Sequence, residues 1–252
     1  MARYVLITGA TSGIGKAIAY AFAENRDHLI ITGRRVEKLK EIQADMIARY
    51  GVTVHYYQMD VTQEAEVVAI CEQILAQVPQ IDILVNNAGL ALGLDKFYES
   101  KVSDMVTMLD TNVKGLLYVT RQILPSMVER NTGHVINIGS TAGIYAYAGA
   151  AVYAATKSAV KFLSDGIRID TIETNIKVTT IQPGIVETDF SAVRFHGDME
   201  RAATVYQGIE ALQTEDIAQS VLFVVNQPRH VQISDMTIMA TQQATGFTIH
   251  RD

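Results

Sequence analysis

The chain has 252 residues, of which 48% are hydrophobic and 19% are charged, and its formal net charge is −6. This length and composition are ordinary for a globular enzyme with one large core, and the negative charge argues against a nucleic-acid partner, which needs a basic face. The single cysteine, Cys71, excludes an intrachain disulfide and no apolar run reaches transmembrane length, so we expect a soluble, cytoplasmic protein without a membrane partner.

Short apolar strands alternate with helical segments along the chain. Strands are expected at residues 4–8, 28–32, 52–59, 81–86, 134–139, 176–182 and 233–239. Helical spacing covers roughly residues 13–25, 36–50, 63–78, 101–130, 150–174 and 214–226. This alternation predicts an α/β fold, a doubly wound parallel sheet in a single domain spanning 1–252. Segment 188–208 interrupts the alternation of strands and helices. Because long connections in compact α/β domains are often lids, we expect a substrate lid there.

The first expected strand leads directly into a glycine-rich loop and then a helix. Glycines let the backbone turn tightly and approach a pyrophosphate, whose charge is favoured by the helix N-terminus. The spacing G-x-x-x-G-x-G differs from the G-x-G-x-x-G dinucleotide pattern, but its place after the first strand favours a cofactor loop over a structural turn. The expected cofactor contacts are Gly9, Thr11, Ser12, Gly13, Ile14 and Gly15.

The end of the second strand carries two arginines, Arg34 and Arg35, directly after Gly33. A fold that is specific for NAD(H) usually has an acidic side chain here, which binds the ribose 2′-hydroxyl. Guanidinium groups instead suit a 2′-phosphate, by charge and by paired hydrogen bonds. The alternative is a solvated basic pair at the start of a helix. We therefore expect NADP(H) as the cofactor.

The ends of the third and fourth strands predict further cofactor contacts. Asp60 and Val61 close the third strand, where an aspartate can reach the adenine amino group. The small residues Asn87, Ala88 and Gly89 follow the fourth strand and leave room for a ribose. Each could instead form an ordinary turn or cap. All lie at the carboxyl ends of strands, where such sheets bind their ligands.

Tyr153, Lys157 and Ser140 form the candidate catalytic group. Tyr153 and Lys157 are four residues apart and so lie on one face of a helix. A lysine cation beside a tyrosine favours the phenolate and lowers the tyrosine pKa from its ordinary value near ~10. Ser140, upstream, could orient a substrate carbonyl or alcohol. A Tyr-x-x-x-Lys match alone is common, so its meaning depends on the other motifs.

Together these motifs resemble the short-chain dehydrogenase/reductase family over essentially the whole chain. The matching ones are Thr8-Gly9-x-x-x-Gly13-Ile14-Gly15, Asn86-Asn87-Ala88-Gly89, Asn112, Ser140, Tyr153-x-x-x-Lys157 and Pro183-Gly184. The resemblance implies a Rossmann-type domain with about seven parallel strands, and usually a dimer or a tetramer. No signature position is substituted, so the resemblance also implies intact chemistry.

The resemblance further implies a role for each residue. Tyr153 would exchange a proton with the substrate oxygen while NADP(H) carries the hydride, and Lys157 would lower the tyrosine pKa and hold the nicotinamide ribose. Ser140 would position the reacting oxygen, and Asn112 would hold a water that links Lys157 to solvent. The residues expected to line the nicotinamide side are Pro183, Gly184, Val186 and Thr188.

Within the family, residues 81–93, 137–143 and 193–195 are similar to the NADP-dependent 3-hydroxy acid dehydrogenases, which act on serine, allo-threonine or short 3-hydroxy acids. A short acid needs a cationic anchor, and Arg194 could bind a carboxylate with two hydrogen bonds. The alternative is a surface or interface arginine. Tyr145 and Tyr147 are expected either to shape the pocket or to pack at a subunit contact.

Two other functions stay open. One is reduction of another short acid-bearing aldehyde, such as a semialdehyde or sulfoacetaldehyde, because a sulfonate would use the same anchor. The other is a nucleotide-sensing protein of the same fold without turnover, which the presence of Ser140, Tyr153 and Lys157 argues against. We expect a homo-oligomer, a tetramer or a dimer, and no metal.

Overall fold

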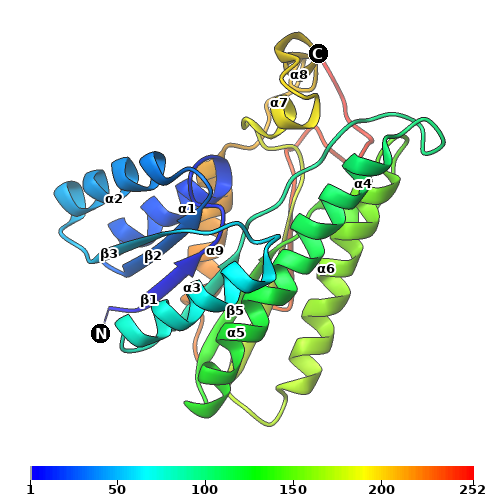
Figure 1. The fold of residues 1–252 in the computed structure, drawn as a ribbon. Helices are drawn as coiled ribbons and strands as arrows, with labels where there is room; N and C mark the ends of the chain where they lie inside the picture. Colours follow the sequence, from blue (N-terminus) through cyan, green and yellow to red (C-terminus); the bar gives the residue numbers. More distant parts are fainter. Residues whose placement is uncertain (1) are drawn as a thin grey trace.

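A seven-stranded parallel sheet forms the centre of the computed structural model, which describes residues 2–252 (Figure 1). Its strand order is β3-β2-β1-β4-β5-β6-β7, so the chain builds outward from β1 first to one edge and then to the other. The strands are β1 (Tyr4–Ile7), β2 (His28–Gly33), β3 (Val54–Gln58), β4 (Ile83–Asn86), β5 (Gly133–Ile138), β6 (Ile176–Pro183) and β7 (Asp235–Ile238).

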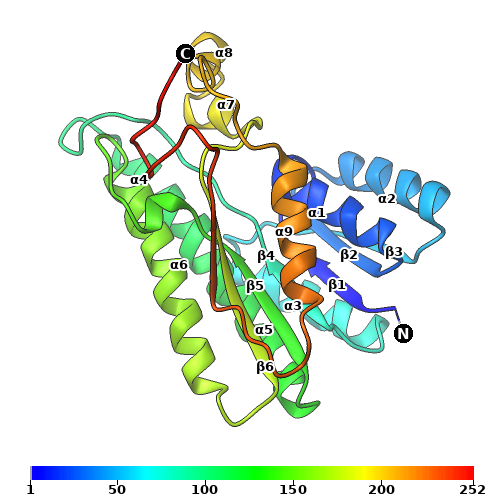
Figure 2. The same ribbon diagram turned by 180° about the vertical axis from the view of Figure 1, so that it is seen from behind.

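Helices cover both faces of this sheet (Figures 1 and 2). The helices of one face are α1 (Gly13–Glu24), α2 (Val36–Tyr50) and α9 (Thr214–Val225). The helices of the other face are α3 (Glu64–Gln77), α5 (Gly115–Glu129) and α6 (Ala151–Asp170). The expected doubly wound Rossmann-type sheet is confirmed.

The side chains of β1 show how one strand serves two cores. Val5 and Ile7 pack in the core under α1 and α9, whereas Leu6 packs in the core under α3 and α5. This follows from strand geometry, because successive side chains point to opposite faces. All three are fully buried. The sheet is thus fixed from both sides, and the loops that leave its carboxyl ends start from rigid positions.

The segment 101–130, expected to be one helix, is divided into three parts. α4 (Val102–Leu109) is followed by one π-helical turn, η1 (Asp110–Lys114), and then by α5. The turn contains the buried residue Asn112. Single π turns inside helices often occur at functional sites, and this one directs the amide of Asn112 toward the loop after β4.

Segment 188–208 contains two short helices, α7 (Phe190–Arg194) and α8 (Met199–Thr204). They project beyond the carboxyl ends of the strands, at the top of Figure 1. Residues 2–252 include no helix that is both long and apolar enough to cross a membrane.

Candidate active site

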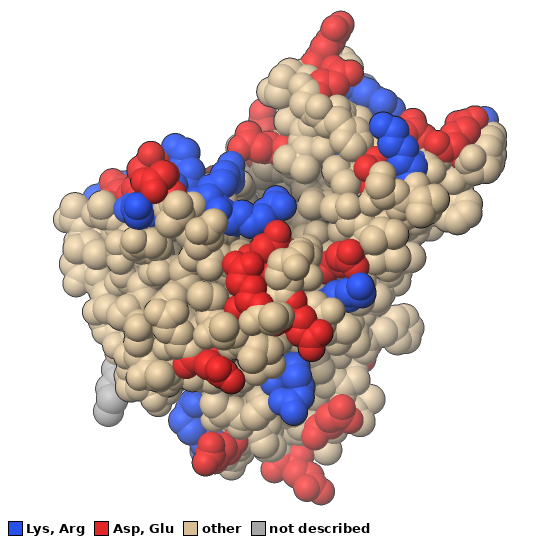
Figure 3. Space-filling model, in the orientation of Figure 1, with Lys and Arg blue, Asp and Glu red and all other residues tan. Residues whose placement is uncertain are grey.

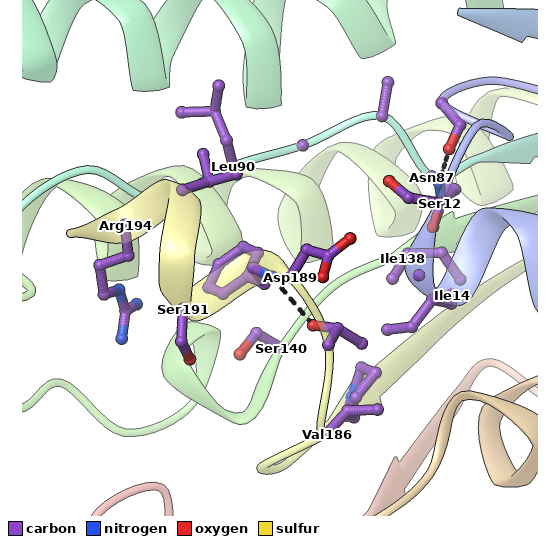
Figure 4. Close-up of a pocket in the computed structure, with 18 of the residues that line it drawn as sticks. Ser12, Ile14, Asn87, Leu90, Ile138, Ser140, Val186, Asp189, Ser191 and Arg194 are labelled. Carbon is purple, nitrogen blue, oxygen red and sulfur yellow. Dashed lines mark hydrogen bonds between the residues drawn. The ribbon is translucent and has the colours of Figure 1, made fainter. Parts of the chain in front are cut away.

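A cavity of about 470 Å³ lies at the carboxyl ends of the strands. It is lined by the loops that follow β1 to β6 and by the segment that contains α7. The strands before β4 are added on one side of β1 and those from β4 onward on the other, so the strand order switches between β1 and β4. Open α/β sheets bind ligands at such a switch point. In Figure 4, Ser12 and Ile14 lie at one end of the cavity, Arg194 and Ser191 at the other, and Ser140 between them. The cavity therefore extends from the glycine loop after β1 to Ser140 and Arg194.

The glycines of the first loop permit close packing that no other residue allows. Gly9 has a φ of +68°, and a Cβ there would lie 2.9 Å from Cα of Ala88. A Cβ on Gly15 would lie 2.3 Å from Nδ2 of Asn87. Positive φ and such short contacts both exclude a side chain. Gly15 thus packs behind the cavity wall rather than lining it, whereas Gly9 and Gly13 line the cavity.

Asn87 and Thr8 hold this loop against the loop after β4. Nδ2 of Asn87 donates to the carbonyls of Thr8 at 2.9 Å and Gly9 at 3.1 Å. In return, the Thr8 hydroxyl accepts from the backbone N–H groups of Asn87 and Ala88, each at 3.1 Å. Four hydrogen bonds therefore fix the relative position of two loops that both line the cavity.

The two arginines after β2 differ in their surroundings. The guanidinium of Arg35 donates to the hydroxyls of Thr11 at 2.7 Å and Ser12 at 2.8 Å. The side chain of Arg34 is exposed and forms no hydrogen bond with the residues that the structure describes. Both line the cavity. In Figure 3, basic side chains gather at the rim of the hollow beside α2. A cation next to two hydroxyls suits a phosphate group.

Asp60 and Val61 form the cavity wall beside this basic rim. One carboxylate oxygen of Asp60, Oδ1, accepts hydrogen bonds from the backbone N–H of Thr62 at 3.0 Å and from its hydroxyl at 2.8 Å. This is the turn that the sequence allowed as an alternative. The second oxygen, Oδ2, accepts no hydrogen bond from residues 2–252, so the turn and a contact to a ligand are compatible.

The candidate catalytic group is buried in the other half of the cavity. Tyr153 and Lys157 of α6 have exposures of only 7% and 6%. Nζ of Lys157 donates to the carbonyl of Ile138 at 2.8 Å and lies 5.9 Å from the centre of the Tyr153 ring. Ser140 stands at the end of β5, and its hydroxyl accepts from the backbone N–H of Ala142 at 3.1 Å. Ser140, Tyr153 and Lys157 all line the cavity.

The electrostatics of Tyr153 differ from the sequence expectation. Burial raises the pKa of Tyr153 to about 12, and the groups that act in the opposite direction are the Arg194 cation and the Ser140 hydroxyl. Lys157, expected to lower the tyrosine pKa, is not among them, and its own burial lowers its pKa to about 8. Two cations therefore stand beside the phenol, Arg194 of α7 at 5.2 Å from the ring centre and Nζ of Lys157 of α6 at 5.9 Å.

Asn112 lies just behind the cavity wall. Its Nδ2 donates to the Leu90 carbonyl at 2.8 Å and to the Thr156 hydroxyl at 3.0 Å, and its Oδ1 accepts from the Leu90 N–H at 2.8 Å. A Cβ on Gly89 would lie 3.2 Å from Oδ1 of Asn112 and 3.5 Å from Nζ of Lys157. The amide thus joins α6, the π turn and the loop after β4 around the lysine.

Arg194 reaches back from α7 over the ring of Tyr153. Its guanidinium carbon lies 5.2 Å from the centre of the Tyr153 ring and 5.3 Å from that of Phe190. The guanidinium donates to the Tyr147 hydroxyl at 3.0 Å, while Nε is buried without a partner. Tyr147 lines the cavity, but Tyr145 does not and packs against Gly246 instead. The sequence could not separate these two tyrosines.

Several cavity residues were not expected from the sequence. They are mainly in the segment after β6 and in the C-terminal region: Leu90, Asp189, Phe190, Ser191, Tyr206 and Gln243. The expected nicotinamide side, Pro183, Gly184, Val186 and Thr188, lines the same cavity. The buried amide of Gln243 accepts from the N–H of Ile185 at 3.0 Å, and its Nε2 has no partner. Across residues 2–252, no three His, Cys, Asp or Glu side chains gather closely enough to hold a metal ion.

Comparison with known proteins extends over nearly the whole chain. The family model described as short chain dehydrogenase matches residues 3–198. The NADP-dependent 3-hydroxy acid dehydrogenase YdfG of Salmonella typhi is 47% identical over 249 residues, which cover 98% of this chain and 99% of that protein. The NADP-dependent 3-hydroxy acid dehydrogenase of Schizosaccharomyces pombe is 40% identical, over 99% of this chain and 96% of that protein. The closed form of serine dehydrogenase complexed with NADP+ has a TM-score of 0.91 at 45% identity, over 99% of this chain and all of that one.

Proposed function

The chain belongs to the short-chain dehydrogenase family, and from this premise we propose that it is an NADP(H)-dependent oxidoreductase that interconverts a short 3-hydroxy acid and its carbonyl form. The substrate class follows the names of its relatives, which are NADP-dependent 3-hydroxy acid dehydrogenases and a serine dehydrogenase. The observation that carries the proposal is the guanidinium of Arg194 above the ring of Tyr153, because it brings an anion-binding group beside the acid/base residue.

The residues of the cavity fit NADP(H). Gly9 and Gly13 would let the pyrophosphate approach the backbone at the start of α1, where the helix N-terminus favours negative charge. Arg35, with the hydroxyls of Thr11 and Ser12, would hold the 2′-phosphate. The free oxygen of Asp60 would face the adenine. The remaining contacts proposed for the cofactor are those of Ile14, Arg34, Val61, Asn87, Ala88, Gly89, Lys157, Pro183, Gly184, Val186 and Thr188. Gly15, expected from the sequence as a contact, would act indirectly, by letting the loop pack against Asn87.

When bound, the cofactor supplies or accepts the hydride. The protein would accept or donate the proton. In oxidation, the phenolate of Tyr153 would take the hydroxyl proton of the substrate, and in reduction the protonated phenol would return it to the carbonyl oxygen. Ser140 would bind the same oxygen and hold it in line with the phenol. Lys157 would hold the ribose, and Asn112 would support the lysine through the loop after β4.

Arg194 and Tyr147 would anchor the acid group at the lid side of the cavity. Each has a proton left to donate: the Nε–H of Arg194 is buried and unpaired, and the Tyr147 hydroxyl accepts from the guanidinium and so keeps its own proton for a ligand. We propose segment 188–208 as the lid that carries this anchor over the substrate. A carboxylate of a short 3-hydroxy acid has two oxygens, which a guanidinium can bind as a pair.

One observation favours a second candidate, a short aldehyde that bears a sulfonate. The buried Nε2 of Gln243 is a third donor without a partner in the same cavity. Together with Arg194 and Tyr147 it would provide one donor for each of the three sulfonate oxygens. Tyr145 packs outside the cavity, so we leave it out of the substrate site.

A panel of short substrates, assayed by NADPH absorbance, tests both candidates. Serine, allo-threonine, 3-hydroxypropionate, malonate semialdehyde and sulfoacetaldehyde would be compared with neutral alcohols and ketones of equal size. We expect higher kcat/KM for the acid-bearing compounds, and the ratio of carboxylate to sulfonate substrates decides between the candidates. Preference for bulky neutral ketones would contradict the proposal.

We also propose a cytoplasmic homo-oligomer, a tetramer or a dimer. The apolar side chains of Phe162 and Ile169 on α6 are 73% and 70% exposed, and Val102 on α4 is 70% exposed. Large exposed apolar side chains on the outer faces of helices are typical of a subunit contact. Light scattering after size-exclusion chromatography would give the mass in solution, and cell fractionation would give the location.

A further inference from the structure

The hydroxyl of Tyr206 contacts the segment that joins β6 to α7. This segment, residues 184–189, contains Val186 and Thr188, which line the cavity next to the catalytic group. The Tyr206 hydroxyl lies 3.2 Å from the carbonyl of Thr188, 3.4 Å from the carbonyl of Val186 and 3.4 Å from the N–H of Thr188. One phenol oxygen therefore meets three backbone groups of one short segment.

The hydroxyl of Ser191 completes this arrangement. It lies 2.8 Å from the Tyr206 hydroxyl, and Ser191 is only 4% exposed. A phenol has one proton to donate and two lone pairs, so the donor to Thr188 or Val186 can at the same time accept from Ser191. The segment and α7 are thus held by the same oxygen. If Tyr206 acted only through packing of its ring, the hydroxyl would make no difference.

The chain around Tyr206 is itself held in place by the last residues. The guanidinium of Arg251 donates to the carbonyls of Gln207 and Val205, the latter at 3.1 Å. The N–H of Asp252 donates to the carbonyl of Gly208 at 3.1 Å. Backbone groups on both sides of Tyr206 are therefore fixed, and its hydroxyl has a defined position relative to the cavity.

Thr188 lies opposite the glycine loop as well as beside the catalytic group. A Cβ on Gly13 would lie 3.6 Å from Cγ2 of Thr188. A ligand that runs from the glycine loop to Tyr153 must pass this segment. The end of that ligand near Tyr153 is the nicotinamide, because the hydride and the proton are exchanged with the same substrate.

We infer that Tyr206 is a positioning residue for the nicotinamide half of the cofactor, acting through the backbone of Val186 and Thr188. This inference rests on the proposed function, since it requires NADP(H) in the cavity. The adenosine half would be held by the residues around Arg35, at the other end of the cavity, and Tyr206 would have no role there.

Binding of two ligands to Tyr206→Phe tests this. The ligands are NADPH and adenosine 2′,5′-bisphosphate, which has the adenosine half and the 2′-phosphate but no nicotinamide. Loss of one hydrogen bond of ordinary strength predicts about three- to tenfold weaker NADPH binding by isothermal titration calorimetry. Affinity for the bisphosphate should change by less than about twofold, because its binding residues are untouched.

Tyr57→Phe is the matched control, because Tyr57 loses one hydrogen bond to Gln77, at 2.6 Å, away from the cavity. It should leave both affinities unchanged. Arg251→Ala should also weaken NADPH binding. The double variant Tyr206→Phe/Arg251→Ala should lose less binding free energy than the sum of the two single variants, since both act through the position of Tyr206.

Unchanged NADPH affinity in Tyr206→Phe, or equal weakening of both ligands, would overturn the inference. If Tyr206→Phe does not fold, Arg251→Ala with the same two ligands decides, because an exposed side chain is replaced. Failure of the wild-type protein to bind NADPH would instead contradict the proposed function. The two failures are thus distinguishable.

Discussion

Removal of the Arg194 charge should move the pH dependence of catalysis, because this cation opposes the effect of burial on Tyr153. Arg194→Gln keeps a polar side chain of similar length without the charge. The tyrosine pKa should then rise. In oxidation the phenolate is the base, so the rising limb of the pH profile should move to higher pH. In reduction the phenol is the acid, so the falling limb should move in the same direction.

The size of the shift follows from the geometry. With 5.2 Å between the guanidinium carbon and the ring centre, two unit charges interact by about 3 kcal/mol at an effective dielectric constant of ~20, or about two pKa units. Arg194 is partly exposed to water, which screens its charge. We therefore expect a shift of about one pKa unit.

The assay is kcat/KM against pH, whose limbs report the pKa of groups in the free enzyme. The position of the limb is independent of the general loss of activity expected when a substrate anchor is removed. Arg194→Lys retains a cation and should restore the wild-type limb. Arg201→Gln is the control, because Arg201 lies over the ring of Phe195, 4.4 Å away, and not over Tyr153. An unmoved limb in Arg194→Gln, or an equal shift in Arg201→Gln, would refute this reasoning.

Three further predictions concern the cofactor loop, the basic rim and the buried lysine. Gly15→Ala should lower the free energy of unfolding by about 1–3 kcal/mol in urea denaturation, because its Cβ would overlap Asn87, whereas Gly166→Ala, with open space around it, should be neutral or slightly stabilising. Arg35→Leu should raise the KM for NADPH about tenfold or more while leaving that for NADH unchanged; equal changes for both would exclude Arg35 as the 2′-phosphate ligand. Lys157→Met should abolish turnover yet stabilise the cofactor-free protein at pH 7 by roughly 1–3 kcal/mol. The folded protein releases the Lys157 proton above about pH 8 and the unfolded chain only near 10.5, so wild-type stability should rise between these values. Urea denaturation from pH 7 to 10.5 should show this contribution in the wild type and not in Lys157→Met.

Strands and glycines could be predicted because their signals are local. The apolar runs of the seven strands were expected within about two residues of their observed bounds, since a strand covered on both faces has few polar residues. Gly9 and Gly15 stand where a Cβ would collide with the loop after β4. Tyr153 and Lys157 could be predicted as a pair because their four-residue spacing puts them on one helix face, and the family resemblance grouped them with Ser140, which follows β5.

Residues that depend on contacts between distant segments could not be predicted. Tyr206 and Gln243 carry no local signal, and they reach the cavity only because the chain after α8 and the C-terminal region fold back over it. The π turn at Asn112 changes hydrogen bonding without changing the apolar pattern. The pKa of Tyr153 depends chiefly on burial, which the spacing of Tyr153 and Lys157 does not report.

The hydrogen bonds between Thr8 and Asn87 join segments 79 residues apart in the chain. The glycine loop therefore reaches its final shape only after β4 has been placed beside β1, and bringing together segments this far apart costs loop-closure entropy. The cofactor cannot bind before this step, because its proposed phosphate-binding loop has not yet formed. Ligand that binds only the completed fold stabilises it by mass action. NADPH should thus raise the melting temperature of the whole domain, by an amount set by its concentration and its Kd, and should not stabilise one loop alone.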